Sequence, residues 1–360
     1  MTRFRAFFDD QIPFSENRLD LCDVIRPFWN NRSLEENIKI YGDFPKWLER
    51  VDSLDKADAA VLPMHWGYYQ RSHQERVGAR FAEQARSANK PLVVFAPGDF
   101  KPHVPFADAV IFGASLYRSK SKSHHFAHAA FLGDYVAQYL GNHMSPRVKG
   151  KKPVVGFCGQ ASSTPVRLMG MWLRNVSLAV RDKLSVLPFE VPPITPHILL
   201  RAKILKTLAQ SDSVQTNFLI RDRYWGGAES VIKQPSQKGD LKREFINNIV
   251  NSDYTVCVRG SGNFSKRLYE TLCCGRIPIF VNTDCVLPFD FKVDWKQYCV
   301  WIEEHEIPKI GEIVAAFHDT LSPKEFIELQ HKCRMFWLRW LTLSGFYEHF
   351  GMHFVLSKSQ

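Results

Sequence analysis

Glycines and basic residues occur together in the stretch RGSGNFSKRLYETLCCGRIPIF, which begins at Arg259. Glycines let a backbone approach a ligand closely, and a helix that begins just after them directs free amide groups at an anion. The pattern predicts a helix from Ser265 to Cys274 that stops at Gly275. These features favour a phosphate group, carried by a dinucleotide, a sugar nucleotide or nucleic acid.

Two side chains of the predicted helix share one face, because Arg267 and Glu270 are three residues apart. The arginine suits a diphosphate, to which it can donate charge-assisted hydrogen bonds of about 1.5–3 kcal/mol each. The carboxylate suits paired ribose hydroxyls. The alternative is that the two side chains form only a surface pair, but the Gly-rich segment before the helix favours ligand binding. The candidate residues for binding a phosphate-bearing ligand are Arg259, Gly260, Gly262, Asn263, Phe264, Ser265, Arg267 and Glu270.

The same stretch resembles the C-terminal motif of the exostosin-like glycosyltransferases, glycosyltransferase family 47. That motif has the form R-G-x-G-x-x-S-x-R-x-x-E-x-x-x-x-G-x-I-P-V, followed by an aspartate, L-P-F and a D-W pair. Upstream, KADAAVLPM and GFCGQASSTPVR are weaker echoes of the family. The residues that match the later part of the motif are Asp284, Leu287, Pro288, Phe289, Asp294 and Trp295.

The resemblance implies an α/β protein of GT-B type, with two Rossmann-like domains facing a central cleft. It implies transfer of a sugar from a nucleotide donor, usually a UDP-sugar, to a glycan or glycolipid-precursor acceptor, with inversion at the anomeric carbon. By the same resemblance, Arg259 and Arg267 bind the diphosphate and Glu270 holds the ribose. Ser265 and the backbone of residues 262–264 close around the phosphates.

An inverting transferase needs a base for the acceptor hydroxyl. We expect the base in the first domain, and the loops after its strands offer Asp99, the first choice, and His65, the second. An ordinary turn aspartate and a packed histidine are the alternatives. Arg167 and Arg221 are further candidate contacts to phosphate, sugar or acceptor. Arginines can replace a metal at the leaving diphosphate, so we expect no metal and no other cofactor.

Strand and helix patterns alternate along most of the chain, which predicts parallel sheets. In the first part, KADAAVLP, PLVVF and ADAVIFG are strand-like. The basic segment SPRVKGKKPVV marks a boundary, after which the alternation resumes from VVGFCG. We expect an acceptor-side domain over residues 1–148 and a nucleotide-sugar-binding domain over residues 149–322. The helical pattern from Pro323 onward is expected to cross back, so that residues 323–360 complete the first domain.

The composition is that of a globular protein of 360 residues, with a formal charge of +10 that suits anionic partners. The chain shows no signal peptide and no apolar run of membrane-spanning length, so we expect a cytoplasmic enzyme. Its basic surface could also contact a membrane peripherally. The eight cysteines lack a C-x-x-C pair and are expected to be reduced and buried.

Other interpretations stay open at this point. The G-x-G-x-x-S turn, with Asp284 after the next strand, also suits an NAD(P)-dependent oxidoreductase. A nucleic-acid-binding protein would explain the charge, but the basic residues are scattered, which disfavours it. The segment HHFAH, from His124, is expected to form a polar surface helix; as a helix it could also bind a metal.

Overall fold

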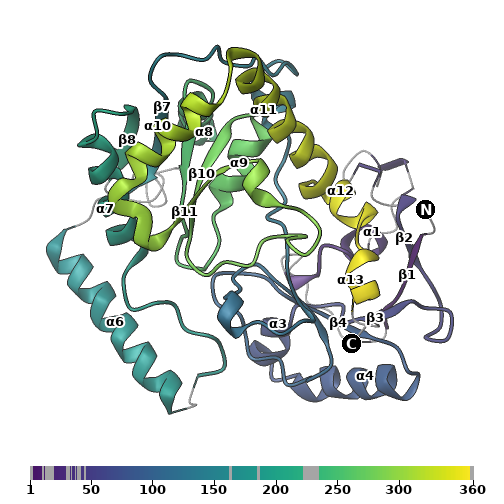
Figure 1. Ribbon diagram of the computed structural model, residues 1–360. Coiled ribbons are helices and arrows are strands. Elements are labelled where there is room, and N and C mark those ends of the chain that lie inside the picture. Colours follow the sequence, from purple (N-terminus) through teal and green to yellow (C-terminus); the bar gives the residue numbers. More distant parts are fainter. Residues whose placement is uncertain are drawn as a thin grey trace.

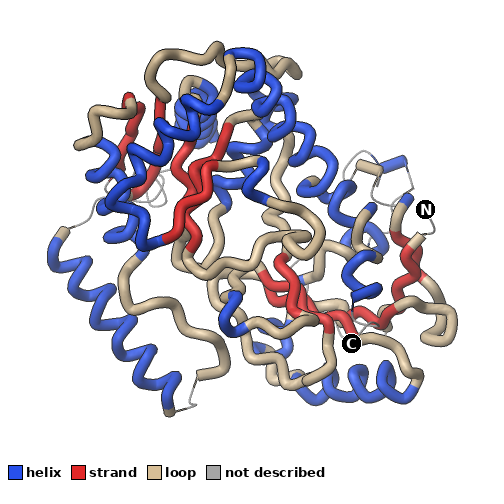
Figure 2. The backbone as a smooth tube through the Cα atoms, in the orientation of Figure 1, coloured by secondary structure: helices blue, strands red, loops and turns tan. Residues whose placement is uncertain are grey.

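The computed structural model contains two parallel sheets with helices around them (Figure 1). It describes residues 3–9, 12, 20–29, 33, 35–36, 38, 42–43, 46–161, 164–184, 187–221 and 235–356. Figure 2 shows the strands in two separate groups, one for each domain. The predicted α/β architecture is therefore confirmed.

The first sheet has six strands in the order β2-β1-β3-β4-β5-β6, with parallel pairing throughout. Its central strands consist of apolar residues and are buried along their length, as parallel strands covered on both faces usually are. Its strands are β1 (Phe4–Phe7), β2 (Leu48–Arg50), β3 (Ala59–Val61), β4 (Leu92–Ala96), β5 (Val110–Gly113) and β6 (His125–Ala127). The helices of this part are α1 (Arg26–Trp29), α3 (Trp66–Arg71), α4 (Glu75–Ser87) and α5 (Tyr135–Tyr139).

The second sheet has five parallel strands in the order β11-β10-β9-β7-β8. Chain order reverses between β7 and β9, since β8 lies on one side of β7 and the later strands on the other. Such a reversal is where open α/β sheets usually bind ligands, at the carboxyl ends of the strands. The strands are β7 (Val154–Gln160), β8 (Gln215–Arg221), β9 (Tyr254–Cys257), β10 (Ile277–Asn282) and β11 (Val300–Glu303). The helices are α6 (Pro165–Lys183), α7 (His197–Ala209), α8 (Pro235–Val250), α9 (Lys266–Cys273) and α10 (Ile310–Thr320).

The C-terminal segment crosses from the second domain to the first, later than the sequence predicts. Helix α11 (Pro323–Phe336) still packs on α9 and β10. A π-helical turn (Trp337–Leu341) follows, and only then do α12 (Leu343–Glu348) and α13 (Met352–Leu356) reach the first sheet. There the ring centroids of Phe350 and Phe4 lie 5.1 Å apart.

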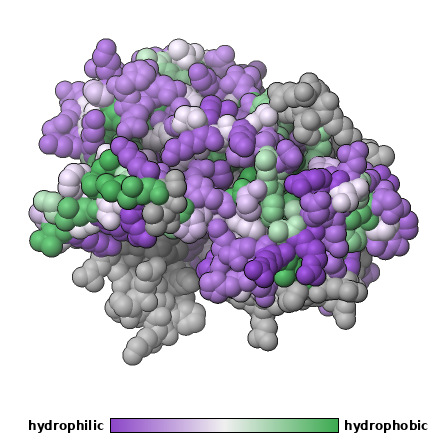
Figure 3. Space-filling model, turned by 90° about the horizontal axis from the view of Figure 1, so that it is seen from below, coloured by the Kyte–Doolittle hydropathy of each residue, from purple (hydrophilic) through white to green (hydrophobic). Residues whose placement is uncertain are grey.

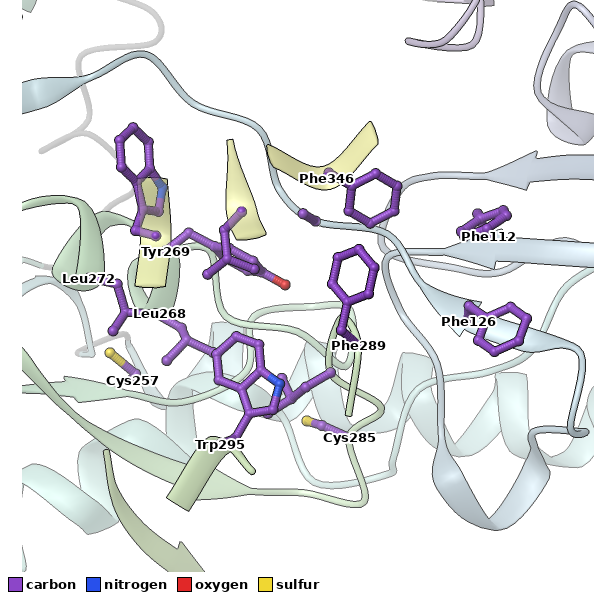
Figure 4. Close-up of a cluster of buried hydrophobic side chains, with 14 of the residues drawn as sticks. Phe112, Phe126, Cys257, Leu268, Tyr269, Leu272, Cys285, Phe289, Trp295 and Phe346 are labelled. Atoms are coloured by element: carbon purple, nitrogen blue, oxygen red, sulfur yellow. The ribbon is translucent and has the colours of Figure 1, made fainter. Parts of the chain in front are cut away.

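Aromatic side chains join the core of the two domains (Figure 4). The rings of Phe289, from the loop after β10, and Phe346, from α12, have centroids 5.1 Å apart. Phe346 in turn lies 6.1 Å from Phe112 of β5. The hydrophobic core therefore continues from one domain to the other through the C-terminal segment.

All eight cysteines are buried free thiols.

The expected surface helix at HHFAH is wrong, because these residues form the edge strand β6. His128, just after it, is buried with its ring 5.4 Å from that of Phe95. The segment forms a strand because it pairs with β5 and is partly buried, although its polar sequence suggests an exposed helix. No helix within the described ranges is long and apolar enough to cross a membrane.

Candidate functional site

The two sheets meet through the loops at the carboxyl ends of their strands. Asp99, after β4, lies against Gly262, after β9: a Cβ atom on Gly262 would be 2.7 Å from the Cα atom of Asp99. The Asp99 carboxylate accepts a hydrogen bond from the Gly262 amide. Partial burial raises the pKa of this carboxyl, and the amide offsets that only in part. Glycine is thus required here by the contact between domains.

Asn263 fastens the same turn to the first domain. Its amide donates to the hydroxyl of Ser115 at 2.7 Å, and its side-chain nitrogen donates to the carbonyl of Leu116 at 3.0 Å. Its side-chain oxygen accepts from the hydroxyl of Thr283 at 2.8 Å. The side chain was predicted to bind the donor, but in this structure it holds three loops together.

Asp284, after β10, also contacts the first domain. Its carboxylate accepts from the hydroxyl of Ser119 at 2.5 Å and from the Ser119 amide at 3.2 Å. Its backbone has a φ of 63°, in the left-handed region that aspartate tolerates better than most residues. An NAD(P)-dependent oxidoreductase would need this carboxylate to bind a ribose. Because the carboxylate is bound to Ser119 instead, Asp284 no longer favours that interpretation.

Arg201 of α7 bridges the point where strand order reverses. Its guanidinium donates to the carbonyl of Gln160, which ends β7, at 3.3 Å, and to the carbonyl of Arg259, just beyond β9, at 3.2 Å. The guanidinium of Arg259 itself is buried and donates to the carbonyl of Thr195 at 2.9 Å. Burial lowers its pKa. Both cations therefore lie at the ligand-binding edge of the second sheet.

Four arginines lie near enough to His197, the first residue of α7, for their charges to act on its imidazole. Burial, and to a smaller extent the charges of Arg201, Arg259, Arg167 and Arg174, lower the pKa of its imidazole to about 3. We call these four arginines the basic cluster. Their combined field attracts anions.

The Gly-rich turn ends in helix α9, as the sequence predicts, and Gly275 follows with a φ of 63°. The amide of Gly260 donates to the carbonyl of Phe264 at 3.1 Å and closes the turn. Ser265 is the N-cap residue, but its hydroxyl makes no capping hydrogen bond. The serine hydroxyl is thus not used to close the helix end.

Arg267 and Glu270 have separate surroundings. Arg267 stacks over the ring of Phe157, 4.2 Å from its centroid, and donates to the carbonyl of Cys158 at 2.7 Å. Glu270 is buried; its carboxylate accepts from the hydroxyl of Tyr135 at 2.9 Å and from Lys242 at 3.2 Å. Burial lowers the pKa of Lys242, whereas the carboxylate raises it. The predicted ribose ligand is therefore also half of an internal ion pair.

His65 is held inside the first domain. Its Nε2 atom lies 3.3 Å from the carboxylate of Asp20, which also pairs with Arg71 at 2.7 Å. Arg167 lies exposed in the first turn of α6, close enough to contribute to the basic cluster. Arg221 ends β8 and pairs with Glu244 of α8. The rest of the predicted RDRYWGG contact lies outside the described residues.

The motif residues after β10 shape a loop beside a separate cavity of about 410 Å³. Asp294 caps a short helical turn through the amide of Lys296, and the indole nitrogen of Trp295 donates to the carbonyl of Pro288 at 2.9 Å. The turn from Gly260 to Ser265 does not line this cavity. In the part of the chain that the structure describes, no cluster of three His, Cys, Asp or Glu side chains could hold a metal ion.

Two parallel α/β sheets that face each other through the carboxyl ends of their strands define a GT-B architecture. Residues 195–317, from the start of α7 into α10, match the Exostosin GT47 domain family. This match confirms the resemblance that the sequence predicts.

Individual relatives match a short part of the chain. It is 30% identical over 90 residues to Exostosin-1 of Drosophila melanogaster, covering 25% of this chain and 11% of that protein. It is 33% identical over 63 residues to a probable glucuronosyltransferase of Oryza sativa subsp. japonica, covering 18% and 15%. A solved glycosyltransferase from Rickettsia africae covers both chains fully, at 10% identity and a TM-score of 0.36. The fold assignment rests on the sheets described above.

Sequence reasoning missed the convergence on His197. Arg174 and Arg201 are ordinary helix residues in the sequence, and His197 follows a Pro-containing loop. The available signal was the resemblance itself, which continues upstream of the Gly-rich turn to residue 195. Only the fold brings these segments to one edge of the sheet.

Proposed function

We propose that this protein is an inverting glycosyltransferase that moves a sugar from a nucleotide donor, a UDP-sugar, to a glycan or glycolipid-precursor acceptor. The observation that carries the proposal is the contact between Asp99 and Gly262. It brings a carboxylate of the first domain to the glycine turn of the second, where the resemblance expects the donor diphosphate.

The basic cluster supports an anionic donor. Arg201 and Arg259 lie at the carboxyl ends of β7 and β9, and Arg267, in the first turn of α9, donates to the carbonyl of Cys158 in β7. The diphosphate would replace backbone carbonyls as the partner of some of these guanidinium groups, with stronger, charge-assisted hydrogen bonds. The hydroxyl of Ser265, which makes no capping hydrogen bond, would supply a further donor at the helix end. The two hydroxyls of the ribose would bind to the carboxylate of Glu270.

The proposed reaction uses Asp99 as general base. The acceptor hydroxyl attacks the anomeric carbon, its proton moves to the Asp99 carboxylate, and the bond from the anomeric carbon to the diphosphate oxygen breaks. The raised pKa of the Asp99 carboxyl suits this role, since a stronger base accepts the proton more readily. The arginines stabilise the charge on the departing nucleotide diphosphate, the task that a metal performs elsewhere. His65, oriented by Asp20, is the second candidate base.

A ligand panel tests this function directly. We expect UDP and at least one UDP-sugar to raise the unfolding temperature in the presence of EDTA, because saturation at about 100 times Kd adds about 2.7 kcal/mol of stability. A UDP-sugar that binds should release UDP when glycan or glycolipid acceptors are added. Stabilisation by NADH alone would contradict the proposal, as would transfer that EDTA abolishes and Mn²⁺ restores.

A further inference from the structure

Helix α6 carries an apolar stripe on its outer side. The stripe residues recur at intervals of three, four, seven and four positions, which keeps them on one face of a helix. They are between 54% and 83% exposed. Figure 3 views the molecule from below, and a hydrophobic band runs along the side where α6 lies in Figure 1. The members of this apolar stripe are Val166, Met169, Leu173 and Val180 of the helix and Leu184, its C-cap residue.

The opposite side of α6 faces the protein. Asn175 is buried, and its side-chain amide donates to the carbonyls of Pro193 and Ile194 at 3.2 Å each. It follows Leu173 by two residues, which is about 200° around the helix. The apolar stripe therefore points away from the domain that holds the helix.

A row of cations flanks the apolar stripe. Arg167, Arg174 and Arg181 are seven residues apart and all exposed, so they line up along the length of the helix. Lys183 adds a further positive charge near the C-terminal end, and Asp182 is the only acidic residue of α6. The exposed surface of this helix thus combines apolar side chains with a positive charge excess.

We infer that α6 docks on the surface of a bilayer rich in anionic phospholipid, with the apolar stripe in the headgroup region and the arginine row on lipid phosphates. A helix of this type lies in the interface, and both its apolar area and its cations add to the affinity. Charge decides against a second copy of the chain as the occupant, because two such helices would bring two arginine rows together with one aspartate each.

The position of α6 links this surface to the candidate site. The helix directly follows the loop after β7, and its first turn carries Arg167 of the basic cluster. Docking would hold the junction of the two domains close to the lipid headgroups. A glycolipid-precursor acceptor is then favoured over a free glycan, and this last step rests on the proposed function.

Vesicle flotation tests the docking without any enzyme assay. We expect the full chain to bind phosphatidylcholine vesicles that contain about 30 mol % phosphatidylglycerol at about 0.1 M salt, and to bind pure phosphatidylcholine vesicles much less. Leu173→Ser with Val180→Ser should lower the partition coefficient about tenfold or more. Arg181→Gln with Lys183→Gln, two exposed cations of α6 outside the basic cluster, should lower it about 30-fold, and high salt should lower it further.

Matched controls come from other exposed helices. Met335→Ser on α11 and the pair Arg76→Gln with Arg80→Gln on α4 should leave vesicle binding unchanged. The docking is overturned if the parent chain does not float with anionic vesicles, or if the α6 variants float as well as the parent. A dimer in solution that Leu173→Ser dissociates, without vesicle binding, would instead assign the stripe to a second copy. Binding of UDP, measured on the same proteins, reports separately on the proposed function.

Discussion

The carboxylate of Asp99 accepts a hydrogen bond from the backbone amide of Gly262, across the junction of the two domains. Asp99 lies in the turn after buried strand β4 of one sheet, and Gly262 lies in the glycine turn after β9 of the other. The proposed catalytic base therefore lies next to the turn that is expected to bind the nucleotide donor.

Asp99→Asn should lower turnover by about 10²–10⁴, or roughly 3–5 kcal/mol of barrier, because the amide cannot take the acceptor proton. The Asn side-chain oxygen can still accept from Gly262, so stability and UDP affinity should change little. His65→Ala, made in parallel, tests the second candidate. Turnover of the Asn variant within threefold of the parent would remove Asp99 from the mechanism, and a loss in His65→Ala alone would transfer the role.

Gly262→Ala should separate the two loops, because the new methyl group would lie within 3 Å of backbone atoms of Asp99 that cannot simply rotate away. Crowding of this kind costs about 1–3 kcal/mol of unfolding free energy. Gly260→Ala is the matched control, since its Cβ atom would come no closer than 3.7 Å, to a guanidinium nitrogen of Arg201. Urea unfolding of both variants measures the difference, and equal stability would show that the close approach imposes no constraint.

Glu270→Gln should cost about 3 kcal/mol of unfolding free energy, because Lys242 is left partly buried without its counter-charge. The ion pair therefore gives Glu270 a structural role beside its predicted contact with the ribose. Adding Lys242→Met should restore most of the stability. If Glu270 also holds the ribose, the double variant should be stable but bind UDP weakly. If the double variant binds UDP as tightly as the parent, the carboxylate has a structural role only.

His353 should make stability depend on pH. Its burial against Phe112 and Phe289 lowers the imidazole pKa to about 3, below the value of about 6.5 in an unfolded chain. The unfolded state therefore takes up a proton first, and stability present above pH 6.5 is lost as the pH falls toward 3. Between pH 7 and pH 5 the loss from this residue is about 2 kcal/mol. His353→Asn should lose correspondingly less over that interval in urea titrations, and an identical pH dependence would refute the assignment.

The sequence predicts those features that depend on local pattern. Buried strands such as PLVVF and helix α9 with its stop at Gly275 follow directly from residue types and spacing. Features that depend on pairing between distant segments were missed. HHFAH becomes a strand because β5 lies beside it, and Asn263 becomes a link between domains because Ser115 reaches it. The arginines around His197 come together for the same reason.

Calorimetric titration of UDP in EDTA tests the central claim most directly, namely that Arg201 and Arg259, at the ends of β7 and β9, bind a nucleotide diphosphate. We expect saturable binding to the parent chain and a loss of about tenfold or more in Arg201→Gln, since each charge-assisted hydrogen bond contributes about 1.5–3 kcal/mol. Arg118→Gln, beside the separate cavity, should bind UDP like the parent. Equal affinity in the parent and Arg201→Gln, or binding that only Arg118→Gln weakens, would contradict the account.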